Sequence, residues 1–358
     1  MGTQVDPGIG NGPARVRGDQ WHLDYLRVPA AHRLSEGQGV VVAVPDTGVE
    51  PHPDLRRNLL AGEDVIPGGT GNGQSDTNSH GTGMAGLIAA HGQPKNLGAL
   101  GVAPLAKILP ILDTPPDGLG QPDDLAASIE FAVARHADII SVSAASMPTP
   151  RLQAAVRAAV QANIIVVAAA GNSPRESVVS YPASEPGVVA VGGVDRTGNH
   201  ADFSVSGPEV DVVAPAVDIY STSTNGRYRR SSGTSDATAI VAGAAALIRS
   251  KYPNLPAVEV AHRLTATAVD KGPPGRDDQY GYGVIDLVAA LTADVPPLGF
   301  ESTGVTAPAP TAAAPDAGGD NSTARGLATL SALLAAGGAY LVWRRRRRAD
   351  DPPPRISR

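Results

Sequence analysis

The chain has 358 residues, of which 42% are hydrophobic and 18% charged, and its formal net charge is −6. This length and hydrophobic fraction suffice for one large globular domain or two ordinary ones. The acidic balance argues against a general nucleic-acid-binding protein, whose binding surface is basic. Because the chain contains no cysteine, disulfides, cysteine-ligated zinc and thiol catalysis are excluded.

The N-terminal stretch, residues 1–19, is polar and rich in glycine, so we expect a disordered extension there. It contains no apolar run of the kind that forms the centre of an export signal.

Residues 20–292 have the pattern of an α/β domain. Continuous apolar runs of strand length alternate with stretches of helical spacing, and such runs are typical of strands covered on both faces. We expect strands at 39–44, 106–112, 137–144, 163–170 and 187–194, and helices at 123–137, 150–162 and 257–268. This alternation predicts βαβ units and a mainly parallel central sheet.

The C-terminal part changes composition twice. Residues 293–325 are rich in Pro, Ala and Gly and are expected to form an extended linker. Residues 326–343 are 18 uncharged residues, about 27 Å as a helix, and five arginines follow at once. A helix packed on the domain is the alternative, but the linker and the arginines favour a transmembrane helix.

The positive-inside rule gives this span an orientation. It places the basic tail, residues 344–358, in the cytoplasm and the domain outside the cell membrane. A domain outside the membrane needs an export signal, which we expect to be encoded upstream of Met1.

Four polar residues follow strands or turns among small neighbours. Asp46 comes after the first strand in PDTGV, His80 lies in NSHGTG, Asn172 lies in AAAGNS, and Ser235 lies in SSGTSDAT before an apolar helix. Each has a simple structural reading as a turn residue, a core histidine or a helix cap. Together they supply a nucleophile, a base, a group that orients the base and an oxyanion donor, which indicates nucleophilic catalysis.

The motifs DTGV, HGT, AAAGN and GTSxAT resemble the subtilisin-like serine proteases, and the resemblance covers residues 20–292. It implies a three-layer α/β fold and an Asp46–His80–Ser235 triad in the chain order known for subtilisin. Asn172 would be the oxyanion donor, the substrate a protein or peptide, and no cofactor or metal is expected. The substrate-binding edge maps onto Ser143, Ala144, Ala145 and Ser146.

A narrower resemblance is carried by QWHLDYLRVPAAH at 20–32 and by HGTGMAGLIAAHG. Both are similar to the mycosins, the membrane-anchored subtilases of type VII secretion systems. This resemblance implies a single-pass protein that acts at the outer face of the cell membrane and associates with a type VII secretion membrane complex.

Departures from the subtilase pattern keep a second function class open. Pro45 predicts that the strand before Asp46 ends early or bulges. The side chains of Ala145 and Ser146 replace glycines, so they are expected to crowd the substrate side chain at P1. Asp236 follows Ser235 directly, where a carboxylate would disfavour a forming oxyanion if it points inward. The chain is therefore predicted to be either an active endopeptidase or a structural subunit with weak or no proteolysis.

The loop before His80, residues 61–80, contains Asp64, Asp76 and Asn78. Their spacing matches no calcium-binding loop, so the sequence favours a solvated loop.

Overall fold

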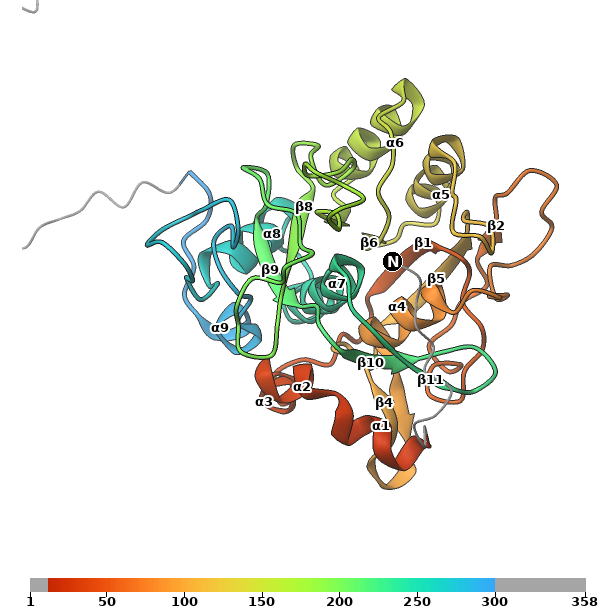
Figure 1. Cartoon of the computed structure of the whole chain (residues 1–358), viewed down its shortest axis with the longest axis horizontal. Helices are drawn as coiled ribbons and strands as arrows, with labels where there is room; N and C mark the ends of the chain where they lie inside the picture. Colours follow the sequence, from red (N-terminus) through yellow and green to blue (C-terminus); the bar gives the residue numbers. More distant parts are fainter. Residues whose placement is uncertain (1–11, 300–358) are drawn as a thin grey trace, which may run out of the picture. The chain divides into compact units, whose positions relative to one another are not determined.

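A seven-stranded sheet runs through the centre of the computed structural model, which describes residues 12–299 (Figure 1). Every neighbouring pair of its strands is parallel. In spatial order the strands are β2 (Glu63–Asp64), β5 (Lys107–Leu112), β1 (Val41–Asp46), β6 (Ile139–Val142), β7 (Ile165–Ala169), β8 (Val189–Val194) and β9 (Val212–Pro215). The predicted α/β class with a mainly parallel sheet is confirmed, and the five expected strands are β1, β5, β6, β7 and β8.

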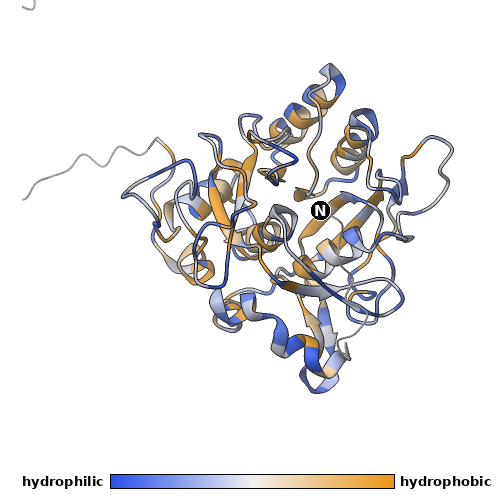
Figure 2. Cartoon of the chain, viewed as in Figure 1, coloured by the Kyte–Doolittle hydropathy of each residue, from blue (hydrophilic) through white to orange (hydrophobic). Residues whose placement is uncertain are grey.

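Helices cover both faces of this sheet. Figure 1 shows α5 (Pro122–Ala134) and α6 (Pro150–Gln161) on one side, and α4 (His80–Ala89) and α7 (Thr234–Lys251) on the other. Every residue of α7 from Asp236 to Arg249 is buried, as expected for a helix that is apolar all round. Hydrophobic residues accordingly follow the central strands in Figure 2. The expected C-terminal helix is α8 (Ala257–Ala266).

The remaining elements are short. Two antiparallel pairs, β3 (His91–Gln93) with β4 (Leu97–Leu100) and β10 (Ile219–Thr222) with β11 (Tyr228–Ser231), lie outside the main sheet. The other helices are α1 (Pro13–Asp19), α2 (Trp21–Tyr25), α3 (Val28–His32), the 3₁₀ turn η1 (Pro94–Asn96) and α9 (Leu287–Thr292).

The N-terminal segment is more ordered than its composition predicts. Pro13–Asp19 form α1, so the expected disorder of residues 1–19 is wrong for this part, while residues 1–11 lie outside the described range. Val16 is buried, and Arg17 donates to the carbonyl of Gly98 at 3.0 Å. Gln20 donates to the carbonyls of Leu100 and Tyr220. These contacts with distant segments stabilise a helix that the local sequence does not predict.

The expected early end or bulge at Pro45 is also wrong. Strand β1 continues in register with β5 through Pro45 and Asp46. The ladder with β6 comprises only Val42 and Ala43. The carbonyl of Asp46 accepts a hydrogen bond from the N–H of Asp113, directly after β5. Because the backbone groups of successive strand residues point to opposite sides, the nitrogen and carbonyl of Pro45 face the β6 side. Proline is tolerated because its missing N–H lies where the ladder has already ended.

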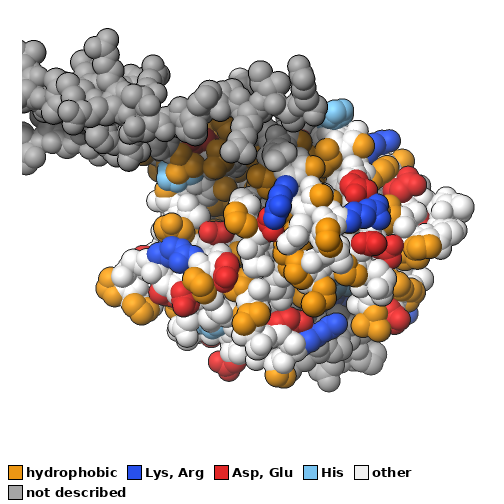
Figure 3. All heavy atoms as spheres, turned by 90° about the horizontal axis from the view of Figure 1, so that it is seen from above, with side chains coloured by type: hydrophobic (Ala, Val, Ile, Leu, Met, Phe, Trp, Pro, Cys, Tyr) orange, Lys and Arg blue, Asp and Glu red, His pale blue; other side chains and the backbone are white. Residues whose placement is uncertain are grey.

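The predicted transmembrane helix at 326–343, the basic tail and most of the linker lie outside the described residues. Within residues 12–299, no helix is both long and apolar enough to cross a membrane. On the face shown in Figure 3, acidic and basic side chains of the described residues are interspersed.

Candidate active site

The structure brings Asp46 and His80 into direct contact. Asp46 ends β1 and is 5% exposed, and both of its carboxylate oxygens lie 2.8 Å from Nδ1 of His80. The N–H of Thr47 donates to Oδ1 of Asp46 at 2.7 Å. His80 begins α4, and its side chain is 24% exposed. The imidazole is thus anchored through Nδ1, which leaves Nε2 as the nitrogen able to exchange protons with another group.

Gly81, the glycine of the HGT motif, is required because the start of α4 lies close to the end of β1. A Cβ on Gly81 would lie 2.1 Å from the carbonyl oxygen of Gly48 and 3.1 Å from Cβ of Asp46. Any side chain there would push α4 away from β1. The small residue beside His80 therefore allows the helix start to pack against the strand end.

Asp76 organises the turn before His80, a role that no local pattern in the sequence indicates. It is 5% exposed, and its Oδ1 accepts from the hydroxyl of Thr47 at 3.0 Å and from the N–H groups of Asn78 and Ser79. Its Oδ2 accepts from the N–H and the hydroxyl of Thr82 at 3.0 and 2.6 Å. The interpretation as a solvated loop is wrong for Asp76. Within residues 12–299, no cluster of three or more His, Asp or Glu side chains could hold a metal ion.

Ser235 lies in the first turn of α7, and its hydroxyl is bound to Ser143, the residue that follows β6. Its Oγ donates to the carbonyl of Ser143 at 3.1 Å, and Oγ of Ser143 donates to the carbonyl of Ser235 at 3.2 Å. Among the described residues, no hydrogen bond joins Ser235 to His80. Rotation about one side-chain bond of Ser235 changes the position of its hydroxyl. The hydrogen bond between a catalytic serine and its base is often unformed in a protein without substrate.

Asn172 follows β7 and is tied to the same helix start. Its Oδ1 accepts from the N–H of Thr234 at 2.9 Å and from the Thr234 hydroxyl at 3.3 Å. Its own N–H donates to Oε2 of Glu176 at 2.8 Å. Because Oδ1 is bound to α7, the amide group is fixed with its NH₂ end as the available donor. This donor and the N–H of Ser235 lie at one end of α7, where negative charge is favoured.

The predicted substrate edge continues directly from β6. Ser143 is buried beside Ser235, Ala144 and Ser146 are partly buried, and Ala145 is exposed. The N–H of Ser146 donates to the carbonyl of Tyr181 at 2.9 Å. The edge is therefore held at both ends, by α7 and by the segment around Tyr181.

The sequence profile of the subtilase family, Peptidase_S8, matches residues 37–283. The chain belongs to the subtilase family of serine endopeptidases. It is 39% identical over 272 residues to subtilisin BL of Lederbergia lenta, covering 75% of this chain and 97% of that protein. It is 41% identical over 275 residues to subtilisin E of Bacillus subtilis strain 168, covering 75% and 70% of the two chains.

Solved structures of mycosins are similar to this subtilase. The MycP3 protease from a type VII (ESX-3) secretion system superimposes with a TM-score of 0.69 at 34% identity, covering 82% of this chain and 92% of that one. MycP1 from Mycobacterium smegmatis gives a TM-score of 0.70 at 30% identity, covering 82% and 88%. The resemblance to subtilases and to mycosins predicted from the motifs is thus confirmed.

Opposing influences act on the pKa of His80 in this subtilase. Burial disfavours the charged imidazole and lowers its pKa, but the hydrogen-bonded carboxylate of Asp46 outweighs this effect. The net result is a pKa above the ordinary histidine value. A base with a raised pKa stays protonated to higher pH, so its proton-accepting form becomes abundant only above about pH 6.5.

Asp236 points inward, an orientation that the sequence alone left open. It is 2% exposed, and Oγ of Ser231 donates to its Oδ1 at 2.7 Å. Burial raises its pKa, and the nearby guanidinium of Arg229 opposes this rise. Arg229 is itself 4% exposed and was not singled out from the sequence.

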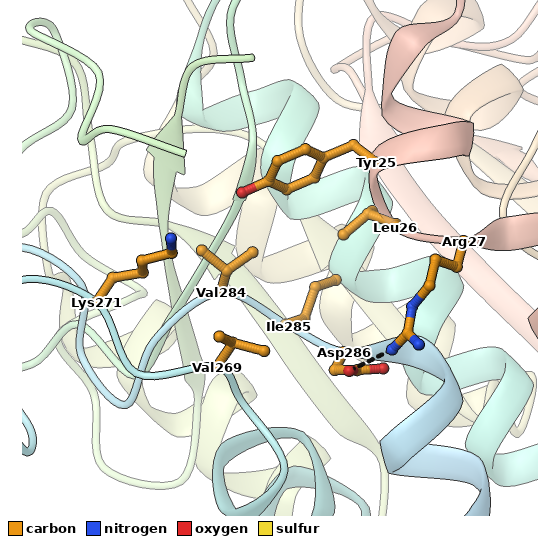
Figure 4. Close-up of a pocket in the computed structure, with 8 residues that line it drawn as sticks. All are labelled: Tyr25, Leu26, Arg27, Val269, Lys271, Val284, Ile285 and Asp286. Atoms are coloured by element: carbon orange, nitrogen blue, oxygen red, sulfur yellow. Dashed lines mark hydrogen bonds and ion pairs between the residues drawn. The ribbon is translucent and has the colours of Figure 1, made fainter. Parts of the chain in front are cut away.

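A separate pocket of about 260 Å³ lies between the N-terminal helices and the segment before α9 (Figure 4). Its apolar wall includes Leu26 and Val284, and Arg27 forms an ion pair with Asp286 across one side. None of its lining residues belongs to the predicted site.

Proposed function

We propose that this subtilase is a membrane-anchored endopeptidase whose catalytic triad is Asp46, His80 and Ser235. The observation that carries the proposal is the pairing of both Asp46 oxygens with Nδ1 of His80 at 2.8 Å. This pairing presents Nε2 as the proton acceptor. Ser235 at the start of α7 supplies the nucleophile, and Asn172 is already fixed to the same helix start.

In the proposed reaction, the hydroxyl of Ser235 leaves the carbonyl of Ser143 and turns to Nε2 of His80. His80 takes the proton as Oγ attacks the peptide carbonyl, and Asp46 stabilises the imidazolium. The NH₂ group of Asn172 and the N–H of Ser235 hold the oxyanion. His80 then protonates the leaving amine, and water hydrolyses the acyl-enzyme by the same steps in reverse order.

Labelling with a fluorophosphonate tests the nucleophile. The full 358-residue chain is expected to be labelled at Ser235 and to hydrolyse a peptide substrate. The variant Ser235→Ala should lose both reactions, whereas Ser232→Ala, which changes a serine three residues earlier, should keep both. Absence of labelling in the unmodified chain would contradict the proposal.

The proposed location rests on the sequence of residues 326–348, with its uncharged span and five following arginines. The catalytic domain lies at the outer face of the cell membrane, and residues 344–358 lie in the cytoplasm. Protease added to intact cells that express the full chain should digest the domain and spare the tail. Protection of the domain would refute this orientation.

Similarity to the MycP proteases supports an association with a type VII secretion membrane complex, because the similar MycP3 protease comes from such a system. The full-length Ser235→Ala variant, purified from its own host in mild detergent, should retain subunits of such a complex. Recovery of the chain without them would remove this part of the proposal.

A structural subunit with weak or no proteolysis is the second candidate. The observation that favours it is the bond of the Ser235 hydroxyl to the carbonyl of Ser143, which occupies the proton that His80 would have to accept. The exposed Ala145 in the substrate edge also favours this candidate, because its side chain replaces a glycine of the subtilase pattern. The labelling experiment separates the two candidates, because a purely structural subunit is not labelled.

A further inference from the structure

Arg229 is a buried cation next to the helix that carries His80. It lies on β11, is 4% exposed, and its Nη1 donates to the carbonyl of Ser79 at 3.0 Å. Ser79 precedes His80 and has a left-handed backbone conformation, with φ of +79°. A single hydrogen bond from Arg229 therefore fixes the backbone at the residue that leads into the imidazole.

The start of α4 leaves room for this guanidinium. A Cβ on Gly83 would lie 2.8 Å from Cδ and 2.9 Å from Nη1 of Arg229. The second glycine of HGTG is thus matched to a specific side chain from another part of the chain. Among residues 12–299, no carboxylate forms a direct ion pair with Arg229, so its charge is balanced over a longer distance.

Asp236 is a buried carboxylate held by the same strand as Arg229. It is buried directly after Ser235, and its one side-chain donor, Ser231, comes from the same strand as Arg229. Arg229 lowers the pKa of Asp236 against the effect of burial. Strand β11 thus supplies both the hydrogen bond and the opposite charge that a buried carboxylate needs.

Three charged groups face His80, each from a different element. Burial lowers the pKa of His80, Asp46 on β1 raises it, Arg229 on β11 lowers it, and Asp236 on α7 raises it. Asp46 is hydrogen-bonded to the ring, whereas the other two act through space. The effects of Arg229 and Asp236 are opposite in sign, so each offsets the other.

We propose that Arg229 and Asp236 are a matched pair of positioning residues for His80, a role that rests on the proposed function of His80 as the base. Arg229 holds the backbone at Ser79 and neutralises Asp236. Asp236 alone would disfavour the oxyanion at Ser235, and Arg229 alone would disfavour the imidazolium. Together they leave Asp46 as the carboxylate that sets the protonation of His80.

The experiment is a two-by-two set of variants of the full chain in detergent: unmodified, Arg229→Met, Asp236→Asn and the double variant. The pKa of His80 is read directly from the imidazole signals in an NMR titration, with the signal assigned by its loss in His80→Ala. The acidic limb of kcat/KM for a peptide substrate is measured in parallel.

The single variants should shift the pKa of His80 in opposite directions. Arg229→Met leaves Asp236 uncompensated and should raise it by about 0.5–1.5 pH units. Asp236→Asn leaves Arg229 uncompensated and should lower it by a similar amount. The double variant should return to within about 0.3 units of the unmodified chain, and the acidic limb should follow each shift.

Two controls separate this role from simple structural support. Arg230→Met removes the same charge from the same strand, but Arg230 faces Asp218 at 3.7 Å and is 42% exposed, so no shift is expected. Arg229→Lys keeps the charge while weakening the bond to Ser79. It should keep the pKa of His80 near its original value while kcat falls.

Shifts of the same sign in the two single variants, or no shift in either, would overturn the proposal. If Arg229→Met does not fold, Asp236→Asn still decides, because an unchanged pKa of His80 in that variant contradicts the pair. The titration needs no turnover. Failure to hydrolyse peptides would therefore refute the proposed function, whereas unshifted titrations would refute the matched pair.

Discussion

The two halves of the proposed active site are held in different ways. Asp46 and His80 are locked together by two contacts of 2.8 Å, and the turn before His80 is built around a buried carboxylate. In the other half, Asn172 is fixed to α7, but the hydroxyl of Ser235 is bound to Ser143.

This difference indicates which part of the proposed site would have to rearrange during the reaction. In the proposed reaction, His80 and Asp46 are preorganised, so little free energy is needed to arrange them when charge develops. Ser235 would have to exchange one neutral hydrogen bond for another, worth about 1 kcal/mol net. The observed arrangement thus differs from the proposed reactive one in the hydrogen-bond partner of the Ser235 hydroxyl.

The largest effect is expected at the moving half. Ser235→Ala should lower kcat by about 10⁴–10⁶, because no other group on α7 replaces the nucleophile. The fold should be retained, since the change removes one oxygen. Measurement of kcat together with the melting temperature tests both statements. Hydrolysis that persists in the purified variant would place the nucleophile elsewhere.

Substitution of Asn172, the proposed oxyanion donor in the half that contains Ser235, should have the next largest effect on kcat. Asn172→Ala should lower kcat by about 10²–10³ with KM little changed, because the lost NH₂ donor binds the oxyanion and not the ground-state substrate. Asn199→Ala, which removes an amide from a surface turn, is the matched control and should leave kcat unchanged. A rise in KM at constant kcat would instead assign Asn172 to substrate binding.

Substitutions in the half that contains Asp46 and His80 should lower the stability of the fold as well as the activity. Asp76→Ala leaves the N–H groups of Ser79 and Thr82 without acceptors in a buried turn and should cost about 3 kcal/mol of unfolding free energy. Urea denaturation measures this loss. Asp64→Ala, at the end of β2, removes a single 3.2 Å backbone hydrogen bond and should cost less than about 1 kcal/mol. Equal losses in both variants would show that Asp76 has no special role.

The candidate catalytic residues of both halves could be predicted from the sequence, whereas the residues that support them could not. Asp46, His80, Asn172 and Ser235 could be found because each stands at a strand end or helix start among small residues. Those signals are local. The family resemblance then connected them, and the structure brings Asp46 to His80 and Asn172 to the start of the helix that carries Ser235.

Arg229 and Gln20, two of the supporting residues, could not be found in the same way, because their partners are distant in sequence. Arg229 bonds to Ser79, 150 positions away, and Gln20 bonds to Tyr220, 200 positions away. A lone arginine or aspartate in a polar stretch is usually a surface residue, and nothing near Asp76 or Arg229 distinguishes them from one. Their burial is a consequence of the tertiary fold.

The smallest effect on kcat is expected at Asp113, which lies next to the half that contains Asp46 and His80. This residue follows β5, is 3% exposed, and donates its N–H to the carbonyl of Asp46 at 3.0 Å. Thr114 donates to its Oδ1 at 2.8 Å, but its Oδ2 has no partner among the described residues. Burial raises the pKa of Asp113 to about 7, above its ordinary value.

The sign of the resulting pH dependence follows from proton binding. Between about pH 4 and 7 the folded chain retains a proton on Asp113 that the unfolded chain has released, so stability falls as the pH rises through this window. Asp113→Asn removes this loss, and the variant should exceed the unmodified chain by about 1–3 kcal/mol at pH 8 and match it near pH 4. Because the backbone bond to Asp46 is kept, kcat should change by less than about threefold. Thermal unfolding at several pH values measures the difference, with the exposed Asp117→Asn as control. A pH dependence identical in Asp113→Asn and in the unmodified chain would mean that Asp113 is ionised in the fold, and that the carboxylate beside Asp46 is stabilised by a group other than Thr114.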